Sequence, residues 1–145
     1  MKVKKFEFSL TKMQRYKKQI LDKEKGVLAV LQRKRNEIEQ EILKLQQFEA
    51  KQSAELIEKQ KKGMSSSQLA GYRFFCENIR MQIDDLKHQL EQLQKQVDAQ
   101  IQVVTKASQE LKSIDKLEEK QLEEYRLEVM RAENEEITEF ITMGL

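Results

Sequence analysis

Apolar residues recur at alternating steps of three and four between Cys76 and Ile114, and this pattern predicts a long helix with one narrow apolar stripe. The stripe consists of two interleaved sets: Cys76, Ile83, Leu90, Val97, Val104 and Leu111, and Ile79, Leu86, Leu93, Gln100, Ala107 and Ile114. The intervening residues are mostly Gln, Lys, Asp and Glu. The stretch is about 58 Å long at about 1.5 Å per residue, which exceeds the width of a small globular core. It therefore has to lie against another long helix.

A second stripe precedes the first one and has charged residues in several of its positions. Its members are Leu10, Met13, Lys17, Ile20, Glu24, Val27, Leu31, Arg35, Ile38, Ile42, Leu45, Glu49, Gln52 and Leu56. Two steps of four adjoin at Val27, Leu31 and Arg35, and such a stutter locally unwinds a supercoil. Gly26 lies beside it and lowers helix propensity. We expect a softer or straighter spot there.

The segment 61–69, KKGMSSSQL, carries a helix stop signal followed by a helix start signal. Its two lysines suit a helix C-terminus, and Gly63 suits the left-handed residue that follows one. Ser65 with Gln68 three residues later has the form of a capping box. The segment therefore predicts a tight connection between two helices, and a single continuous helix kinked here is the alternative.

These signals predict an all-α fold, an antiparallel coiled-coil hairpin of two long helices with its turn near Gly63–Ser67. The first helix is expected at about 9–61, the turn at 62–66 and the second helix at about 67–141, within a single elongated domain over 1–145. No Pro interrupts the chain, and Pro is the strongest helix breaker.

Folding about this turn pairs residues whose numbers sum to roughly 129, so Leu45 is expected opposite Ile83. Ser9 or Thr11 is placed to cap the first helix, and Thr11 with Gln14 again has the form of a capping box. The first stripe, Cys76–Ile114, continues beyond Ile114 in a shifted register, at Leu117, Leu122, Tyr125, Val129, Ala132 and Phe140.

Charge is distributed unevenly, although the net charge is only +2 and 36% of residues are charged. Residues 1–35 hold twelve Lys or Arg against three acids, whereas residues 115–145 hold ten acids against four bases. Opposite charges along a coiled-coil rim select the orientation of the helices more than they add stability. A small net charge gives no strong global attraction to nucleic acid.

Groups for catalysis are sparse. His88 and Cys76 are the only His and the only Cys, and twelve residues of helix place them about 18 Å apart along the axis. They form neither a nucleophile–base pair nor a zinc site. No Gly-rich phosphate loop, membrane-spanning apolar run or signal-peptide core is present, and one Cys gives no reason to place the chain outside the cytosol. We expect a non-enzyme without metal or cofactor.

Aromatic residues are dense near the predicted turn. Tyr72, Phe74 and Phe75 cannot all point into one narrow stripe, and Phe48 is expected across the hairpin near Arg80–Met81. Clustered exposed aromatics are typical binding anchors, so we expect a partner surface here. The alternative is that these rings only wrap and cap the end of the hairpin.

Three ordered segments make the chain resemble the FliJ family, the small coiled-coil component of the flagellar type III export apparatus. The opening KFEFSL at 5–10 resembles the family's F-x-F-x-L pattern. The segment from Gly63 through Leu69, Tyr72, Phe75 and Ile79 resembles its turn and the start of its second helix, and Ala132–Ile137 with Phe140 resembles its acidic C-terminus. The adjacent pair Phe74 and Phe75 departs from the family, which has a more polar pair there.

The resemblance implies an antiparallel two-helix coiled coil similar to the gamma stalk of rotary ATPases, located at the cytoplasmic face of the cell membrane. It implies that the end bearing the termini engages the hexameric flagellar export ATPase, for which the candidate residues are Phe6, Phe8, Leu10, Met13, Tyr125 and Val129. It also implies that the turn-proximal half engages the cytoplasmic domain of the export-gate membrane protein, for which the candidates are Leu45, Phe48, Tyr72, Phe75 and Ile79. Export chaperones are further implied partners, without nucleic acid and without direct membrane insertion.

Two other hypotheses remain open from the sequence. A homodimeric coiled-coil scaffold would pair the stripes of two parallel copies. A basic-helix nucleic-acid binder would use the basic N-terminal third in a parallel dimer. The turn signal at Gly63–Gln68 discriminates against both, because it folds the chain back on itself.

Overall fold

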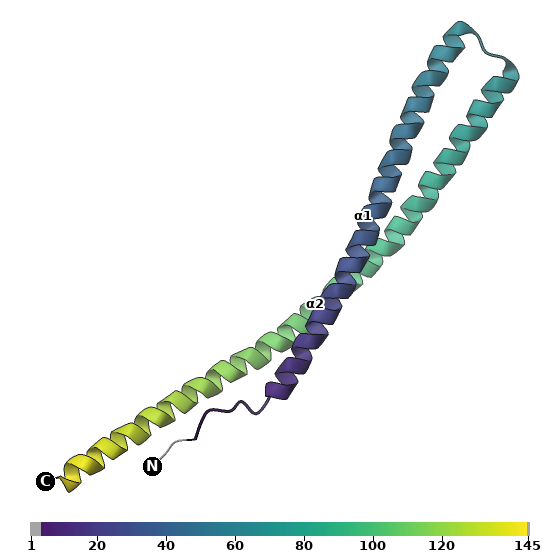
Figure 1. Ribbon diagram of the computed structural model, residues 1–145. Coiled ribbons are helices and arrows are strands. Elements are labelled where there is room, and N and C mark those ends of the chain that lie inside the picture. Colours follow the sequence, from purple (N-terminus) through teal and green to yellow (C-terminus); the bar gives the residue numbers. More distant parts are fainter. Residues whose placement is uncertain (1–3, 145) are drawn as a thin grey trace. The chain divides into compact units, whose positions relative to one another are not determined.

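The computed structural model describes residues 4–144, and nearly all of them belong to two helices. Helix α1 spans Thr11–Lys62 and helix α2 spans Ser66–Met143 (Figure 1). No strand occurs in the described part of the chain. The all-α fold is therefore confirmed, and the helix bounds lie one or two residues from those expected from the sequence.

The connection between the helices is only three residues long, Gly63 to Ser65. Gly63 has a φ angle of +95°, which residues with a Cβ rarely adopt. The backbone N–H of Ser65 donates to the Gln68 side-chain oxygen at 3.3 Å, and the backbone N–H of Gln68 donates to Ser65 Oγ at 3.2 Å. The predicted capping box is therefore present, and it satisfies helix N–H groups that lack a backbone acceptor.

Contacts divide the chain into two compact units, each made from parts of both helices. The turn unit comprises Gly26–Gln102, and the terminal unit comprises Met1–Lys25 with Val103–Leu145. The expectation of one elongated domain over 1–145 stays a prediction.

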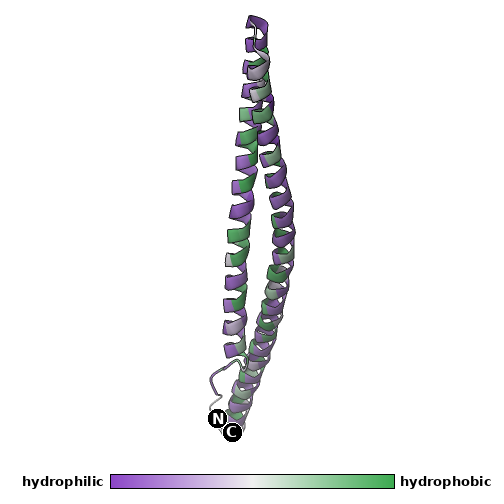
Figure 2. Ribbon diagram, turned by 90° about the vertical axis from the view of Figure 1, so that its right-hand side faces the viewer, coloured by the Kyte–Doolittle hydropathy of each residue, from purple (hydrophilic) through white to green (hydrophobic). Residues whose placement is uncertain are grey.

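The turn unit has a small core between its two antiparallel helix segments. Ile42, Ile79 and Ile83 are buried against one another, and the residues packed around them are Ile38, Leu45, Leu86 and Leu90. Val97 is fully buried. Each of these residues belongs to one of the predicted apolar stripes, which appear in Figure 2 as hydrophobic segments spaced among hydrophilic ones.

Polar contacts across the turn unit fix its register. The Arg35 guanidinium donates to Gln94 Oε1 at 3.4 Å, and Arg80 Nε donates to Glu49 Oε1 at 2.9 Å. The residue numbers in both pairs sum to 129, as the turn position predicts. The seam is therefore filled from within the chain, which leaves a parallel homodimer without its apolar interface.

The terminal unit follows the same register. The Gln14 side-chain amide donates to Asp115 Oδ1 at 2.7 Å, and their numbers again sum to 129. Phe8, Leu21 and Ala107 are its buried apolar residues among those described. With few deeply buried residues, this unit depends on a long, shallow contact between its helix segments.

The stripe predicted for the start of α1 is wrong by one residue at three positions: the inner face holds Gln14, Leu21 and Leu28 in place of Met13, Ile20 and Val27. Met13 and Val27 are 48% and 39% exposed, whereas Leu21 is buried and Leu28 half-buried. With Gln14, Leu21 and Leu28 on the inner face, the steps from Leu10 to Leu56 alternate between four and three without interruption. The expected stutter at Val27 is therefore absent, because Leu28 occupies the position that Val27 was assigned.

The start of α1 also differs from the expected capping box. The Thr11 hydroxyl donates to the backbone carbonyl of Phe8 at 2.8 Å, and the Gln14 side chain reaches across to Asp115. Because the helix begins at Thr11, its hydroxyl is one position too late to act as the N-cap. In α2, Leu117 is 37% exposed and the neighbouring Glu118 is half-buried, so the shifted stripe does not include Leu117.

Candidate protein-binding surfaces

We group three phenylalanines of the turn unit as the turn-proximal aromatic surface: the contacting pair Phe48 and Phe75, and Phe74, which lines a separate hollow on α2 with residues such as Leu69 and Arg73. The rings of Phe48 and Phe75 pack edge to face, with centroids 5.7 Å apart and planes at 75°. Both residues nevertheless remain about two-fifths exposed, and Phe74 is 73% exposed. Exposed aromatic area of this kind exceeds what the contact between two helices uses.

The other candidates at this surface have different environments. Ile79 is only 4% exposed and Leu45 packs against the cluster that contains it, so both hold the helices together beneath the surface. The Glu49–Arg80 pair places Phe48 across from Met81, as expected, and the Phe48 ring packs against Phe75 nearer the turn. The exposed part of the predicted site therefore consists of the aromatic rings.

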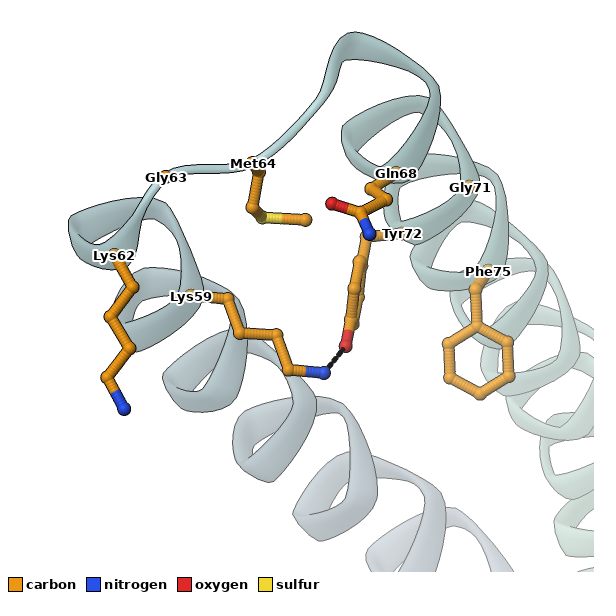
Figure 3. Close-up of a pocket in the computed structure, with 8 residues that line it drawn as sticks. All are labelled: Lys59, Lys62, Gly63, Met64, Gln68, Gly71, Tyr72 and Phe75. Atoms are coloured by element: carbon orange, nitrogen blue, oxygen red, sulfur yellow. Dashed lines mark hydrogen bonds between the residues drawn. The ribbon is translucent and has the colours of Figure 1, made fainter.

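Tyr72 lies between the turn-proximal aromatic surface and the turn itself. The Lys59 ammonium, on the opposite helix, donates a hydrogen bond to the Tyr72 hydroxyl (Figure 3). This hydrogen bond raises the pKa of Lys59 above its ordinary value. Lys59 and Tyr72 thus connect α1 to α2 close to the turn.

The terminal unit presents a second surface, which we call the terminal surface: Phe6, Met13, Tyr125 and Val129. The ring of Phe6 packs against the ring of Tyr125, with centroids 5.5 Å apart and planes inclined at 45°. Met13 is 48% exposed, and Val129 is half-buried. The candidates Phe8 and Leu10 lie further inside, because Phe8 is buried and Leu10 is half-buried.

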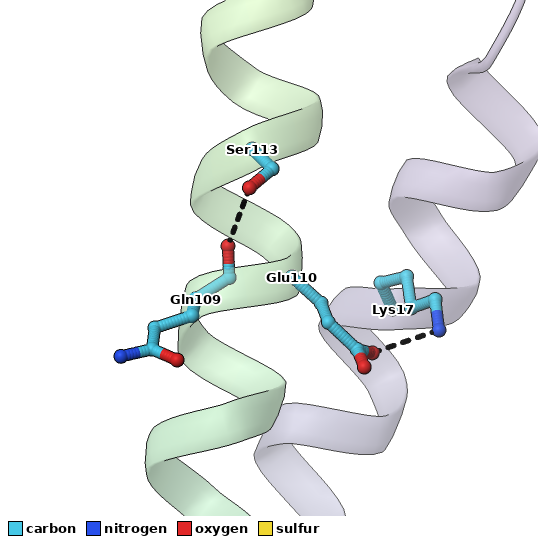
Figure 4. A network of polar contacts seen from close by, with 4 residues as sticks. All are labelled: Lys17, Gln109, Glu110 and Ser113. Atoms are coloured by element: carbon cyan, nitrogen blue, oxygen red, sulfur yellow. Dashed lines mark hydrogen bonds and ion pairs between the residues drawn. The ribbon is translucent and has the colours of Figure 1, made fainter.

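Polar contacts hold the two helix segments of the terminal unit in place. Lys17 Nζ donates to Glu110 Oε2 at 2.9 Å, while the Ser113 hydroxyl donates to the Gln109 carbonyl one turn earlier on α2 (Figure 4). The Lys17 ammonium lowers the pKa of Glu110. This ion pair joins the basic N-terminal third to the C-terminal half of the chain, as the charge distribution indicates.

The last turns of α2 carry exposed apolar side chains among glutamates. Every residue from 133 to 144 is exposed, and Phe140 reaches 79%. The aromatic contact of Phe6 is made with Tyr125, which precedes this segment. Phe140 therefore offers exposed apolar area that neither helix covers.

A sequence model described as "Flagellar FliJ protein" matches residues 6–144, which is nearly the whole chain. The chain belongs to the FliJ family. Membership of the FliJ family identifies it as a coiled-coil protein associated with flagellar protein export, in a family of non-enzymatic export components. Comparison with curated proteins and with solved structures found no match. Within residues 4–144, neither helix combines the length and the apolar character that crossing a bilayer requires.

Two features of these surfaces were not among the predicted site residues. Phe74 is the most exposed of the three turn-proximal phenylalanines, and its place beside Phe75 was the available signal. Gly71 lies where an added Cβ would meet no atom within 4 Å, so its missing side chain leaves open space next to Tyr72. An isolated glycine inside a helical pattern was the signal for that position.

Proposed function

We propose that this FliJ-family chain couples two parts of the flagellar export apparatus without catalysing a reaction itself. The terminal surface engages the hexameric export ATPase, and the turn-proximal aromatic surface engages the cytoplasmic domain of the export-gate membrane protein. The observation that carries the proposal is the family match over residues 6–144. It is supported by two exposed apolar surfaces that belong to different units of the chain.

The terminal surface suits a ring partner through its mixed chemistry. Met13 offers a flexible exposed apolar side chain in the same unit as the Phe6–Tyr125 ring pair. Basic residues from the start of the chain and acidic residues from its end lie in the same unit. Such a surface offers both charge signs around apolar anchors, which favours specific orientation in a charged cleft.

The turn-proximal aromatic surface suits a partner with an apolar pocket. Phe74 projects most of its area into solvent, while Phe48 and Phe75 brace each other. Aromatic side chains placed on a rigid support lose little conformational entropy on binding. The buried Ile79 and the half-buried Leu45 supply that support from below.

Export chaperones are further proposed partners, and the proposed location is peripheral, at the cytoplasmic face of the membrane near the flagellar base. Both proposals rest on the family match alone. Nucleic acid is not a proposed partner, because the basic N-terminal third packs against acidic α2 through pairs such as Lys17 with Glu110.

The experiment compares two single variants on two partners. Met13→Ala should weaken stimulation of the hexameric export ATPase while leaving affinity for the export-gate domain unchanged. Phe74→Ala should do the reverse, so each variant is the control for the other. Truncation of an interface anchor commonly costs about 2 kcal/mol, which is about thirtyfold in affinity. If neither variant changes either interaction, or both variants weaken both equally, the assignment of the two surfaces is wrong.

A further inference from the structure

A groove lies beside the turn, between the end of α1 and the start of α2. Its volume is about 610 Å³, and its lining residues are Lys59, Lys62, Gly63, Met64, Gln68, Gly71, Tyr72 and Phe75. In Figure 3, Met64 and the Lys59 side chain point toward Tyr72 from one side, and Phe75 lies further along α2. The groove therefore combines an apolar floor with a basic edge.

The charged residues that line the groove have one sign. Lys59 and Lys62 line it, and no carboxylate is among its lining residues. The last turn of α1 holds three lysines, and the first turn of α2 holds no acid. The N-terminus of α2 also carries partial positive charge from its backbone N–H groups. An occupant that brings negative charge to this edge is favoured over a neutral or basic one.

The floor of the groove is shaped by Gly71. A Cβ at this position would meet nothing within 4 Å, so neither packing nor backbone conformation requires a glycine here. Glycine is among the poorest helix formers, yet it lies within the second turn of α2. What its missing side chain provides is open space beside Tyr72, one helical turn before Phe75.

We propose that this groove binds an acidic peptide segment in which one aromatic or aliphatic side chain is flanked by carboxylates. The apolar side chain lies over Gly71 against the rings of Tyr72 and Phe75. The flanking carboxylates accept hydrogen bonds from the ammonium groups of Lys59 and Lys62. This site shares Phe75 with the turn-proximal aromatic surface and goes beyond it, since its recognition depends on Lys59 and Lys62, which neither proposed surface contains.

The test uses the full-length chain and fluorescently labelled synthetic peptides. The first peptide has a single Phe within a run of Asp and Glu. The second replaces Asp and Glu with Asn and Gln, and the third replaces Phe with Ala. The acidic Phe peptide should bind at least about tenfold more tightly than either of the others at low salt, and its affinity should fall as salt rises.

Two matched variants test whether the peptide binds in the groove or to another part of the chain. Gly71→Leu fills the floor and should weaken binding of the acidic Phe peptide by about tenfold or more. Gly26→Leu is its control, because Gly26 is also a helical glycine whose added Cβ would meet nothing within 4 Å. Both substitutions raise helix propensity, so circular dichroism should show that both variants remain helical. Replacing Lys59 and Lys62 together with Gln should weaken binding several-fold.

Several results would overturn the proposal. Equal binding of the acidic and amide peptides would mean that the site is an apolar surface without charge selection. Unchanged affinity in Gly71→Leu, or the same loss in Gly26→Leu, would mean that the peptide binds elsewhere on the chain. None of these results depends on the export ATPase or the export gate. The peptide site can therefore be refuted while the proposed coupling of ATPase and gate stands, and the reverse is also possible.

Discussion

Paired truncation of Phe48 and Phe75 distinguishes packing from recognition at the turn-proximal aromatic surface. Each residue is about three-fifths covered, at 42% and 40% exposed. Since full burial of a large apolar side chain contributes about 1.5–3 kcal/mol, each single change to Ala should cost about 1–2 kcal/mol of unfolding free energy. The edge-to-face geometry of the rings should add a coupling of about 0.5–1.5 kcal/mol.

The assay is urea unfolding of the two single variants and the double variant, followed by helical circular dichroism. The double variant should lose less stability than the sum of the singles, because the ring–ring contact can be lost only once. Phe74→Ala is the matched control, since a residue 73% exposed should change stability by no more than about 0.5 kcal/mol. Additive losses, or a large cost for Phe74→Ala, would refute the packing described for this surface.

Binding to the export-gate domain is measured on the same variants. Phe74→Ala should weaken the complex while sparing stability, whereas Phe75→Ala should affect both. A lower stability of Phe75→Ala with unchanged gate affinity in both variants would show that these rings only hold the helices together.

Four further substitutions test the fold itself. Gly63→Ala should destabilise the chain by about 1–2 kcal/mol in thermal or urea unfolding, because the φ angle of Gly63 is +95°. Gly26→Ala should instead stabilise the chain by up to about 1 kcal/mol, because Ala has the higher helix propensity. Equal effects of the two substitutions would contradict the turn geometry. Val97→Ala should cost about 1–3 kcal/mol in urea unfolding, because Val97 is fully buried, and a neutral result would place it outside the seam. Glu110→Gln should lower the melting temperature at neutral pH, because it removes the ion pair with Lys17. Since Lys17 lowers the pKa of folded Glu110, the difference in melting temperature should vanish as the pH falls through that pKa. A difference that persists in acid would exclude the ion pair as its cause.

The sequence was sufficient to predict the elements whose signals are local. The stripe from Cys76 to Ile114 occupies the inner face of α2, since a seam with a three-and-four repeat has only one way to face a partner helix. Gly63 and the Ser65–Gln68 capping box placed the turn, because each demands a specific backbone conformation or hydrogen bond. The register near 129 then followed from the turn position.

Features that depend on both helices together were harder to predict. In α1, Met13 and Gln14 are adjacent candidates for the same seam position, as are Val27 and Leu28. The apolar pattern assigned the seam to Met13 and Val27, whereas Gln14 and Leu28 lie on the inner face. Gln14 lies on the inner face because Asp115 of α2 accepts its hydrogen bond, a contact that no local pattern contains.

The candidate binding residues also divide into those that a local sequence signal predicts and those that depend on packing between the helices. Phe48, Phe74 and Phe75 were recognisable as an aromatic excess at one part of the chain, but their exposed fractions depend on the packing across the seam. Ile79 has the same apolar signature as a binding residue and is buried in the core instead. The groove at Gly71 was not predicted, because open space beside a helix is a property of the assembled turn.

The central claim is that one chain joins the export ATPase to the export gate through two separate surfaces. The direct measurement is capture of the soluble export-gate domain on immobilised hexameric ATPase, with and without this chain. The gate domain should be retained only when the chain is present, and Met13→Ala and Phe74→Ala should each reduce its retention. Release of the chain from the ATPase by excess gate domain would contradict the account, because the two partners would then compete for one surface.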